Sequence, residues 1–292
     1  MNMPTLLLPS RPGQLVDVAF RTHLKEARCY NCDGPAEEGP YRQTAFGRRF
    51  QFFRCRHCTH LFIYPHFTSE EVALIFSDEY FAEGGAWADG IFEGSYEDAR
   101  PKLEKEALLV LDMFRNVTGK DFFGLRILEI GCAGGTFLDV ARTHGAETVG
   151  IEPNRKMADR TREAGHDVFC GTVESIPLDQ FEGEFDLVVL MDVLEHVQFP
   201  RKLMNRISRW SRSASHILIR GPVDMGRPLN RASQFVRRSL GIPKDLGSDV
   251  RDAHHWNLRS LKTFLGRGDF EIDEIRGATA TFANIVASRG AS

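Results

Sequence analysis

The sequence predicts an α/β fold in which a mostly parallel sheet follows a small cysteine-rich domain. From residue 125 onward, short apolar strands alternate with amphipathic helices, which is the pattern of βαβ units. A glycine-rich loop at residues 131–135 follows the first of these strands. Upstream of them, four cysteines form two Cys-x-x-Cys pairs. The length of 292 residues leaves room for both parts.

The cysteine pairs are the first element with a defined chemistry. Cys29 and Cys32 are separated from Cys55 and Cys58 by twenty-two residues. Two thiolates three positions apart can hold one ion from a tight turn, and two such pairs complete a tetrahedral shell that suits Zn²⁺. Because a closed shell leaves no position for water or substrate, we expect a structural zinc in a zinc-ribbon-like domain. The aromatic-rich segment 41–53 predicts a short hairpin between the pairs.

The downstream elements follow from the apolar pattern. The predicted strands, the last two forming a hairpin, are 125–130, 148–152, 167–170, 185–191, 216–221, 270–276 and 281–288. The predicted helices are 136–144, a helix capped by Asn154 that runs to about residue 164, 200–212 and 258–267, with a further helical run at 100–117. We therefore divide the chain into a zinc-binding domain at 24–66, a helical linker or cap at 67–124 and an α/β domain at 125–292.

The glycine-rich loop and an acid on the next strand predict an adenosine-containing ligand. Gly131, Gly134 and Gly135 let the backbone turn sharply and approach a ligand closely. Glu152 ends the following strand, twenty-one residues after Gly131. A carboxylate there can accept hydrogen bonds from both ribose hydroxyls. In sheets of this kind, ligands bind beyond the carboxyl ends of the strands.

These residues resemble those of the class I S-adenosylmethionine-dependent methyltransferases. The matching segments are 127–135 (first motif), 150–153 (ribose-binding segment), 170–177 (adenine-contacting loop), 185–197 (fourth strand and its turn) and 254–258 (before the helix that precedes strand six). The resemblance implies a Rossmann-like, seven-stranded methyltransferase sheet with a terminal β-hairpin. It also implies S-adenosylmethionine as the cofactor and methyl transfer as the activity.

The resemblance places the cofactor on residues of these segments, namely Glu129, Gly131, Cys132, Ala133, Gly135, Glu152, Thr172, Val173 and Met191. Segment 67–124 is expected to close over the cofactor, with Tyr80 reaching its methionine end. Where the family often has Asp in the adenine loop, this chain has Thr172. The adenine amine is then held by the Thr172 hydroxyl, by Glu174 or by backbone alone.

Three histidines are candidates for the base that takes a proton from the methyl acceptor. His196 follows the fourth strand, and the tandem pair His254 and His255 follows a basic insertion, with His255 favoured by the resemblance. Asp192, Glu195 and His196 also resemble positions that hold a divalent metal, here Mg²⁺, in quinone-biosynthesis O-methyltransferases. The alternative is that Glu195 pairs locally and His196 packs under the sheet edge.

The insertion at 222–257 is long enough to be a lid or an acceptor-binding segment. It carries five arginines that could grip phosphate, Arg227, Arg231, Arg237, Arg238 and Arg251. We therefore expect a small-molecule acceptor, phosphorylated or nucleotide-linked, such as an activated sugar methylated on a hydroxyl. C- or N-methylation of a small molecule is the alternative, and the sequence leaves the oligomeric state open.

The bulk composition and two rival functions narrow this interpretation. A net charge of −3 favours no class of partner. No apolar run approaches the ~18–20 residues that span a bilayer, and residues 1–10 lack the basic region of a secretory signal. The Cys-x-x-Cys pairs are typical of a reducing compartment, so we expect a cytoplasmic chain. A nicotinamide-dependent oxidoreductase would share the glycine loop but not the terminal hairpin. A nucleic-acid methyltransferase or zinc-ribbon binding module would use aromatics and arginines near the cysteine pairs, which more simply form a minimal core.

Overall fold

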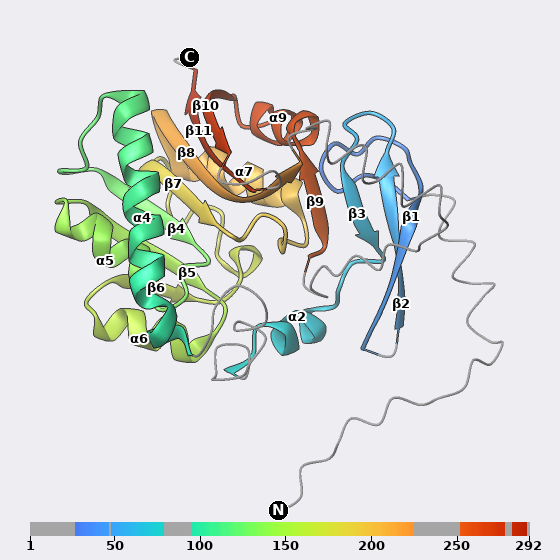
Figure 1. Ribbon diagram of the computed structural model, residues 1–292, viewed down its shortest axis with the longest axis horizontal. Coiled ribbons are helices and arrows are strands. Elements are labelled where there is room, and N and C mark those ends of the chain that lie inside the picture. The colour runs from blue at the N-terminus through green and yellow to red at the C-terminus, as the bar shows by residue number, and fades with distance from the viewer. Residues whose placement is uncertain (1–26, 47, 79–94, 225–251, 278–281, 291–292) are drawn as a thin grey trace, which may run out of the picture.

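The central sheet is that of an α/β fold with a terminal hairpin. The computed structural model describes residues 27–46, 48–78, 95–224, 252–277 and 282–290. Its parallel strands are β4 (Arg126–Ile130), β5 (Glu147–Glu152), β6 (Asp167–Cys170), β7 (Phe185–Met191) and β8 (Ser211–Asp224). The antiparallel pair β10 (Phe270–Gly277) and β11 (Phe282–Arg289) lies alongside β8 (Figure 1). These strands overlap all the predicted ones, although β8 begins earlier than expected.

The strand order changes direction at β4. The chain adds β5 and then β6 on one side of β4, and β7 and then β8 on the other. Such a switch point opens a crevice at the carboxyl ends of the strands. The loops that follow β4 and β7 both start at this crevice and touch, because a Cβ at Gly131 would lie 2.5 Å from Val193 Cγ2.

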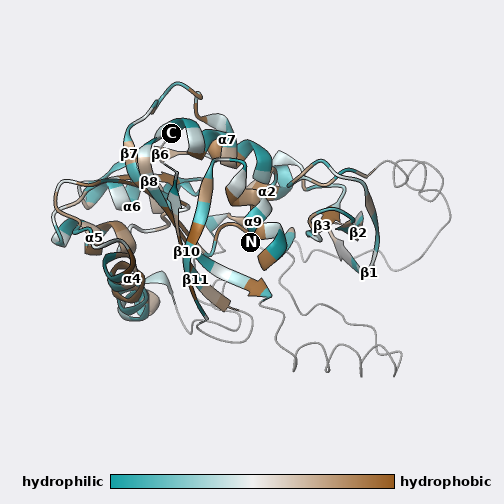
Figure 2. Cartoon of the chain, turned by 90° about the horizontal axis from the view of Figure 1, so that it is seen from above, coloured by the Kyte–Doolittle hydropathy of each residue, from teal (hydrophilic) through white to brown (hydrophobic). Residues whose placement is uncertain are grey.

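Helices cover both faces of the sheet. On one face lie α4 (Tyr96–Thr118), α5 (Thr136–Thr143) and α6 (Arg155–Glu163), and on the other lie α7 (Pro200–Trp210) and α9 (Leu258–Gly266) (Figure 2). Each helix presents its apolar side chains to the strands, so the sheet is buried between two apolar layers. The predicted cap of α6 is confirmed, since the Asn154 side chain accepts a hydrogen bond from Met157 N.

The cysteine-rich segment extends the same sheet. Its antiparallel strands are β1 (Ala36–Ala45), β2 (Arg48–Cys55) and β3 (Leu61–Tyr64), and the predicted hairpin is formed by the first two. A short strand, β9 (His254–Asn257), pairs with β3 on one edge and with the end of β8 on the other. The described strands therefore form an eleven-stranded sheet, which contains the seven strands predicted for the α/β domain together with β1, β2, β3 and β9. β9 connects the cysteine-rich strands to the α/β strands, because its extended backbone pairs with β3 on one side and with β8 on the other.

A short helix that the sequence analysis did not identify, α2 (Ser69–Ile75), follows β3. Thr68 and Glu71 form a capping box at its start, so the Thr-x-x-Glu spacing was a usable signal. Among the described helices, none is long and apolar enough to cross a membrane.

Candidate functional site

The glycine-rich loop turns sharply between β4 and α5. The amides of Gly131 and Cys132 both donate to Ile151 O, at 2.8 and 3.2 Å, which holds the loop against the end of β5. Gly135 adopts a φ of 82°, in the left-handed region that favours glycine. At Gly134 a Cβ would lie 2.4 Å from the Tyr96 ring, so only glycine lets α4 approach the loop this closely.

Glu152 binds this loop from the carboxyl end of β5. Its Oε2 accepts from Ala133 N and its Oε1 from Asn154 N, both at 2.8 Å. The residue is only 3% exposed. Burial raises the pKa of Glu152 to about 7, against the lowering effect of the two amides. Each carboxylate oxygen keeps lone-pair capacity for a further donor, as a ribose diol would require.

Glu129, the acid of the first motif, lies deeper beneath the loop. It is 4% exposed, and burial raises its pKa well above the usual range, with the nearby Glu152 adding to the effect. Cys132 is buried too, and its thiol pKa is raised by the same burial. A buried thiol with a raised pKa is a poor nucleophile, so Cys132 acts as a small packing residue.

A cleft of about 280 Å³ opens at the residues that directly follow Glu152. One wall is α2 with the residues after it, and the other is formed by Pro153, Asn154 and the Gly171-Thr172 turn. Asn154 Nδ2 joins the walls, donating to Phe76 O at 3.1 Å and Asp78 Oδ1 at 3.0 Å. Thr172, predicted to contact adenine, therefore lines this cleft, while Val173 is buried behind it.

Tyr96 on α4 covers the glycine loop. Its hydroxyl lies 2.7 Å from Thr136 Oγ1 and accepts from Thr136 N at 3.3 Å, so it caps the first turn of α5. Arg160 lies 4.9 Å from the Tyr96 ring and donates to Gly134 O at 2.7 Å. The sequence analysis did not identify Tyr96, because nothing in the local pattern distinguishes it from other helix-start aromatics.

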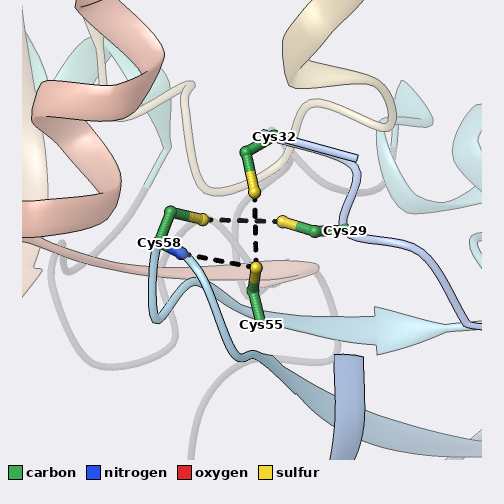
Figure 3. A group of neighbouring side chains, drawn as sticks. All are labelled: Cys29, Cys32, Cys55 and Cys58. Carbon is green, nitrogen blue, oxygen red and sulfur yellow. Dashed lines mark hydrogen bonds between the residues drawn. The ribbon is translucent and has the colours of Figure 1, made fainter. Parts of the chain in front are cut away.

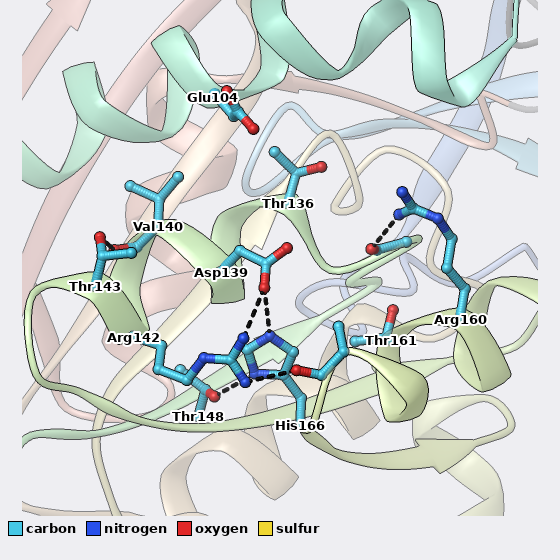
Figure 4. A network of polar contacts seen from close by, with 12 residues as sticks. Glu104, Thr136, Asp139, Val140, Arg142, Thr143, Thr148, Arg160, Thr161 and His166 are labelled. Atoms are coloured by element: carbon cyan, nitrogen blue, oxygen red, sulfur yellow. Dashed lines mark hydrogen bonds and ion pairs between the residues drawn. The ribbon is translucent and has the colours of Figure 1, made fainter.

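A polar network behind the loop fixes α5 (Figure 4). Asp139 binds Arg100 of α4 at 2.9 Å, Arg142 at 3.0 Å and His166 Nε2 at 3.0 Å. His166 Nδ1 in turn lies 2.6 Å from Thr148 Oγ1 on β5. The network ties α4, α5 and β5 together, which makes the loop between β4 and α5 a rigid feature.

The loop after β7 carries His196, which contacts a residue that lines the cleft. The His196 ring lies 5.7 Å from that of Phe76, which lines the cleft. Its Nδ1 is 3.5 Å from Asp252 Oδ1 and its Nε2 is 4.0 Å from Glu195 Oε1. Asp252 was missed in the sequence, because its partner is far away along the chain.

The tandem histidines lie on β9. His254 is 1% exposed, with its ring 4.9 Å from that of His60, and burial lowers its pKa to about 3. Such a weakly basic, enclosed imidazole is a poor proton acceptor at neutral pH. The His255 ring lies 5.3 Å from that of Phe52 and faces the cysteine-rich segment. Neither placement favours a role as the base.

The three residues predicted to hold Mg²⁺ do not converge. Asp192, with a φ of 55°, turns its carboxylate to Arg220, which also binds Glu106 at 2.8 Å. Glu195 is buried under Gly221, and burial raises its pKa. Among the described residues, the cysteines form the one group of three or more metal-ligating side chains within 4.8 Å of one another. The expected magnesium site is therefore not formed in this arrangement.

The four cysteines gather as predicted (Figure 3). Cys29 Sγ lies 3.6 Å from Cys58 Sγ, and Cys32 Sγ lies 3.3 Å from Cys55 Sγ. A tetrahedral ion with ~2.3 Å metal–sulfur bonds needs sulfur–sulfur edges of ~3.8 Å, so small adjustments would fit one. The backbone amides of Gly34 and His57 donate to Cys32 and Cys55, as expected around thiolates.

Several predicted residues remain to be placed. Met191 ends β7, opposite Arg220 of β8, at the crevice. Tyr80 and the five arginines of the insertion lie outside the described residues.

Comparison with known proteins gives a consistent result. A family model described as a methyltransferase domain matches residues 96–275. Ubiquinone biosynthesis O-methyltransferases are similar: that of Hahella chejuensis is 26% identical over 53% of this chain and 67% of its own length, and that of Bradyrhizobium sp. is 40% identical over 46% of this chain and 52% of its own length. The chain thus spans about half to two thirds of these two relatives.

Solved structures share the fold. The magnesium protoporphyrin IX methyltransferase of Synechocystis PCC 6803 with bound SAH aligns with a TM-score of 0.52 and 17% identity, over 76% of this chain and 100% of that one. The PH0226 protein of Pyrococcus horikoshii OT3 aligns with a TM-score of 0.50 and 14% identity, over 75% of this chain and 99% of that one.

Proposed function

This chain belongs to the methyltransferase domain family, and from that premise we propose that it transfers a methyl group from S-adenosylmethionine to a hydroxyl group of a small molecule. The observation that carries the proposal is Glu152, buried at the carboxyl end of β5 and bound to the glycine-rich loop. This is where a ribose diol can be recognised, at the point where strand order reverses. The similarity to enzymes named O-methyltransferases supports oxygen as the acceptor atom.

In this proposal, different residues around the cleft bind different parts of the cofactor. Glu152 accepts the ribose hydroxyls, and the turn at Thr172 receives the adenine in the cleft. The loop from Gly131 to Gly135 supports the methionine end, with Tyr96 and Arg160 holding its backbone. When bound, S-adenosylmethionine supplies a methyl group attached to its own leaving group, a thioether. The chain's task is then to place the acceptor in line and remove its proton.

His196 is the base in this proposal. It lies at the crevice, 17% exposed, beside a residue that lines the cleft. With Nδ1 facing the Asp252 carboxylate, Nε2 is the ring atom that receives the proton of the acceptor hydroxyl. Asp252 orients the ring and stabilises the imidazolium that forms. His254 and His255 stay on β9 as packing residues between the two parts of the sheet.

The residues around His196, namely 192–196 with Arg220 and Asp252, are called the acceptor edge here. They favour an acceptor whose reacting group is uncharged. Arg220 is paired with Glu106 and Asp192, and His196 faces Asp252. We place a neutral hydroxyl here, as in a sugar. A phosphate or nucleotide part of the acceptor remains part of the proposal through the arginines of the insertion.

The four-cysteine cluster holds a structural zinc ion in this proposal. Four thiolates close the tetrahedral shell, so no position is left for a reacting group. The ion would fix the two turns that carry the cysteines, beside an apolar core that already buries Phe50, Phe52, Phe53 and Phe62.

Radiolabelled methyl transfer across sugars, nucleotide sugars, phenols and quinols tests the function, with mass spectrometry of the product. We expect a product 14 mass units heavier per transfer, carrying the new methyl group on oxygen. Methylation on carbon or nitrogen would overturn the oxygen assignment, and no transfer to any acceptor by a chain that binds the cofactor would overturn the acceptor class.

A further inference from the structure

Each Cys-x-x-Cys turn carries a non-glycine residue in the left-handed conformation. Asp33 follows Cys32, and Thr59 follows Cys58, and both have a φ of 62°. Glycine adopts this region without steric cost, whereas a β-branched residue such as threonine is strained there. A strained residue persists only where its surroundings hold it. The contacts of Thr59 therefore indicate what its side chain is for.

Those contacts cross from the cysteine turn to the catalytic part of the sheet. The Thr59 hydroxyl lies 3.1 Å from Asn257 Oδ1 and 2.6 Å from Cys58 O, and Asn257 Nδ2 donates to Thr59 O at 3.0 Å. Asn257 is the last residue of β9 and caps α9 by accepting from Ser260 N at 3.0 Å. One turn of the cysteine cluster thus fixes both the end of β9 and the start of α9.

The other end of β9 is held by the strand that follows the same turn. Ile63 N on β3 donates to Ala253 O at 2.9 Å, and β3 pairs with β9. Ala253 directly follows Asp252, which faces His196 Nδ1 at 3.5 Å. His254 N also donates to Glu195 O at 3.0 Å, next to His196 in the chain. The segment that carries Asp252 is therefore placed by β3, which follows the cysteine turn, and by the loop that carries His196.

The strands proposed to bind the cofactor, β4 and β5, lie further from the cysteine turn than β9 does. In the strand order, β8 and β7 separate β9 from β4, and Glu152 lies beyond that on β5. Among the residues that the structure describes, Thr59 forms hydrogen bonds with Cys55, Cys58 and Asn257 and none with the glycine-rich loop. A change at Thr59 is thus expected to reach the acceptor edge before it reaches the cofactor.

Asp33 provides a natural comparison within the same cluster. Its backbone is left-handed like that of Thr59, but its side chain is half exposed and pairs with Arg201 at 3.2 Å and Arg28 at 3.9 Å. Exposed ion pairs of this kind contribute little. The two turns therefore differ in what their left-handed residue contacts, not in backbone shape.

We propose that Thr59 is a positioning residue that couples the four-cysteine cluster to the acceptor edge, by holding β9 so that Asp252 stays against His196. The coupling rests on the proposed function, with His196 as the base. Because of this coupling, the turnover number depends on the cysteine turn, whereas the affinity for the cofactor does not.

The test compares Thr59→Gly with Asp33→Gly in the full-length, zinc-loaded chain. Both changes relax the backbone, so zinc content and folding are preserved. In Thr59→Gly we expect kcat to fall about fivefold, the effect of one lost hydrogen bond. The KM for S-adenosylmethionine and the Kd of S-adenosylhomocysteine should stay within about twofold of wild type. Thr59→Ser, which restores a hydroxyl, should recover turnover, and Asp33→Gly should match wild type.

Hydrogen exchange gives a readout that needs no acceptor. Amides of residues 253–257 should exchange faster in Thr59→Gly than in wild type or Asp33→Gly. If these amides exchange faster in Thr59→Gly while the wild-type chain transfers no methyl group, the result would support the coupling and contradict the proposed function. Wild-type exchange at these amides, or wild-type kcat in Thr59→Gly when the wild-type chain turns over, would overturn the coupling.

Discussion

Glu152 is almost fully buried. Its two carboxylate oxygens accept hydrogen bonds from the backbone amides of Ala133 and Asn154. Burial raises its pKa from 4.5 to about 7. A raised carboxyl pKa means that the folded chain binds more protons than the unfolded chain between these values. The contribution of Glu152 to stability is therefore fully present below pH 4.5 and is lost as the pH rises through about 7. The affinity for the cofactor is expected to change with pH in the opposite direction, because the ionised carboxylate is the stronger hydrogen-bond acceptor.

We expect the affinity for S-adenosylhomocysteine to increase as the pH rises from 6 to 8, through the Glu152 pKa of about 7. Glu152→Gln should bind about tenfold or more weakly, since it loses a charge-assisted acceptor, and its affinity should vary little with pH. Calorimetric titration over this pH range measures both. A Glu152→Gln chain with the wild-type pH profile would show that another group controls binding.

His196→Ala is expected to lower kcat by about 10²–10⁴-fold, the usual contribution of a positioned base. The Kd of S-adenosylhomocysteine should be unchanged, because in the proposed function His196 acts on the acceptor and does not bind the cofactor. Steady-state kinetics of His196→Ala, His255→Ala and His254→Ala separate the candidates, with His144→Ala at the far end of α5 as the control. A larger loss of kcat in His255→Ala than in His196→Ala would move the base to β9.

At the scale of elements, α4 is the support of the glycine-rich loop. Tyr96→Phe removes the hydroxyl that pairs with Thr136 N and Oγ1 and leaves both groups buried without that partner. We expect S-adenosylhomocysteine to bind about fivefold more weakly, with a small decrease in Tm. Thr143→Val, which removes a hydroxyl at the other end of α5, is the matched control and should bind as wild type does. Equal Kd values for the two variants would show that Tyr96 does not support the loop.

The cysteine-rich segment is expected to depend on its metal for folding. The purified chain should contain one zinc ion, and removal by a zinc chelator should expose the amides of β1 to β3 to hydrogen exchange, because the ion would join the turn before β1 to the turn between β2 and β3. A chelator selective for calcium should have no effect. Full protection of these strands in a zinc-free chain would contradict the structural role.

Sequence patterns predicted those elements whose signal is local. The apolar strands, the glycine-rich loop, Glu152 and the paired cysteines are each defined by neighbours in the chain, and the structure confirms their positions. Asp252 and Tyr96 gain their roles from partners 56 and 40 residues away. Such contacts depend on how strands are ordered in the sheet, which periodicity does not encode. The ion pair between Asp192 and Arg220 of the neighbouring strand could not be predicted for the same reason.

At the scale of the whole molecule, one sheet joins the cofactor crevice to the cysteine-rich segment. The crevice lies where strand order reverses at β4, and β9 connects the two parts by pairing with both β8 and β3. The sequence predicted a zinc-binding domain at 24–66, a helical linker or cap at 67–124 and an α/β domain at 125–292, because its patterns change between them. In the structure β9 lies between β8 and β3 (Figure 1), with Asp252, which faces His196, just before it and Asn257, which contacts Thr59 of the cysteine turn, at its end.

The most direct test of this account is calorimetric titration of the zinc-loaded chain at pH 8 with S-adenosylmethionine, S-adenosylhomocysteine and NADH. The account predicts saturable binding of both sulfur compounds at one site per chain, abolished or strongly weakened in Glu152→Gln, and no binding of NADH. Binding of NADH instead, or no heat with either sulfur compound from a folded chain, would contradict the assignment of the crevice.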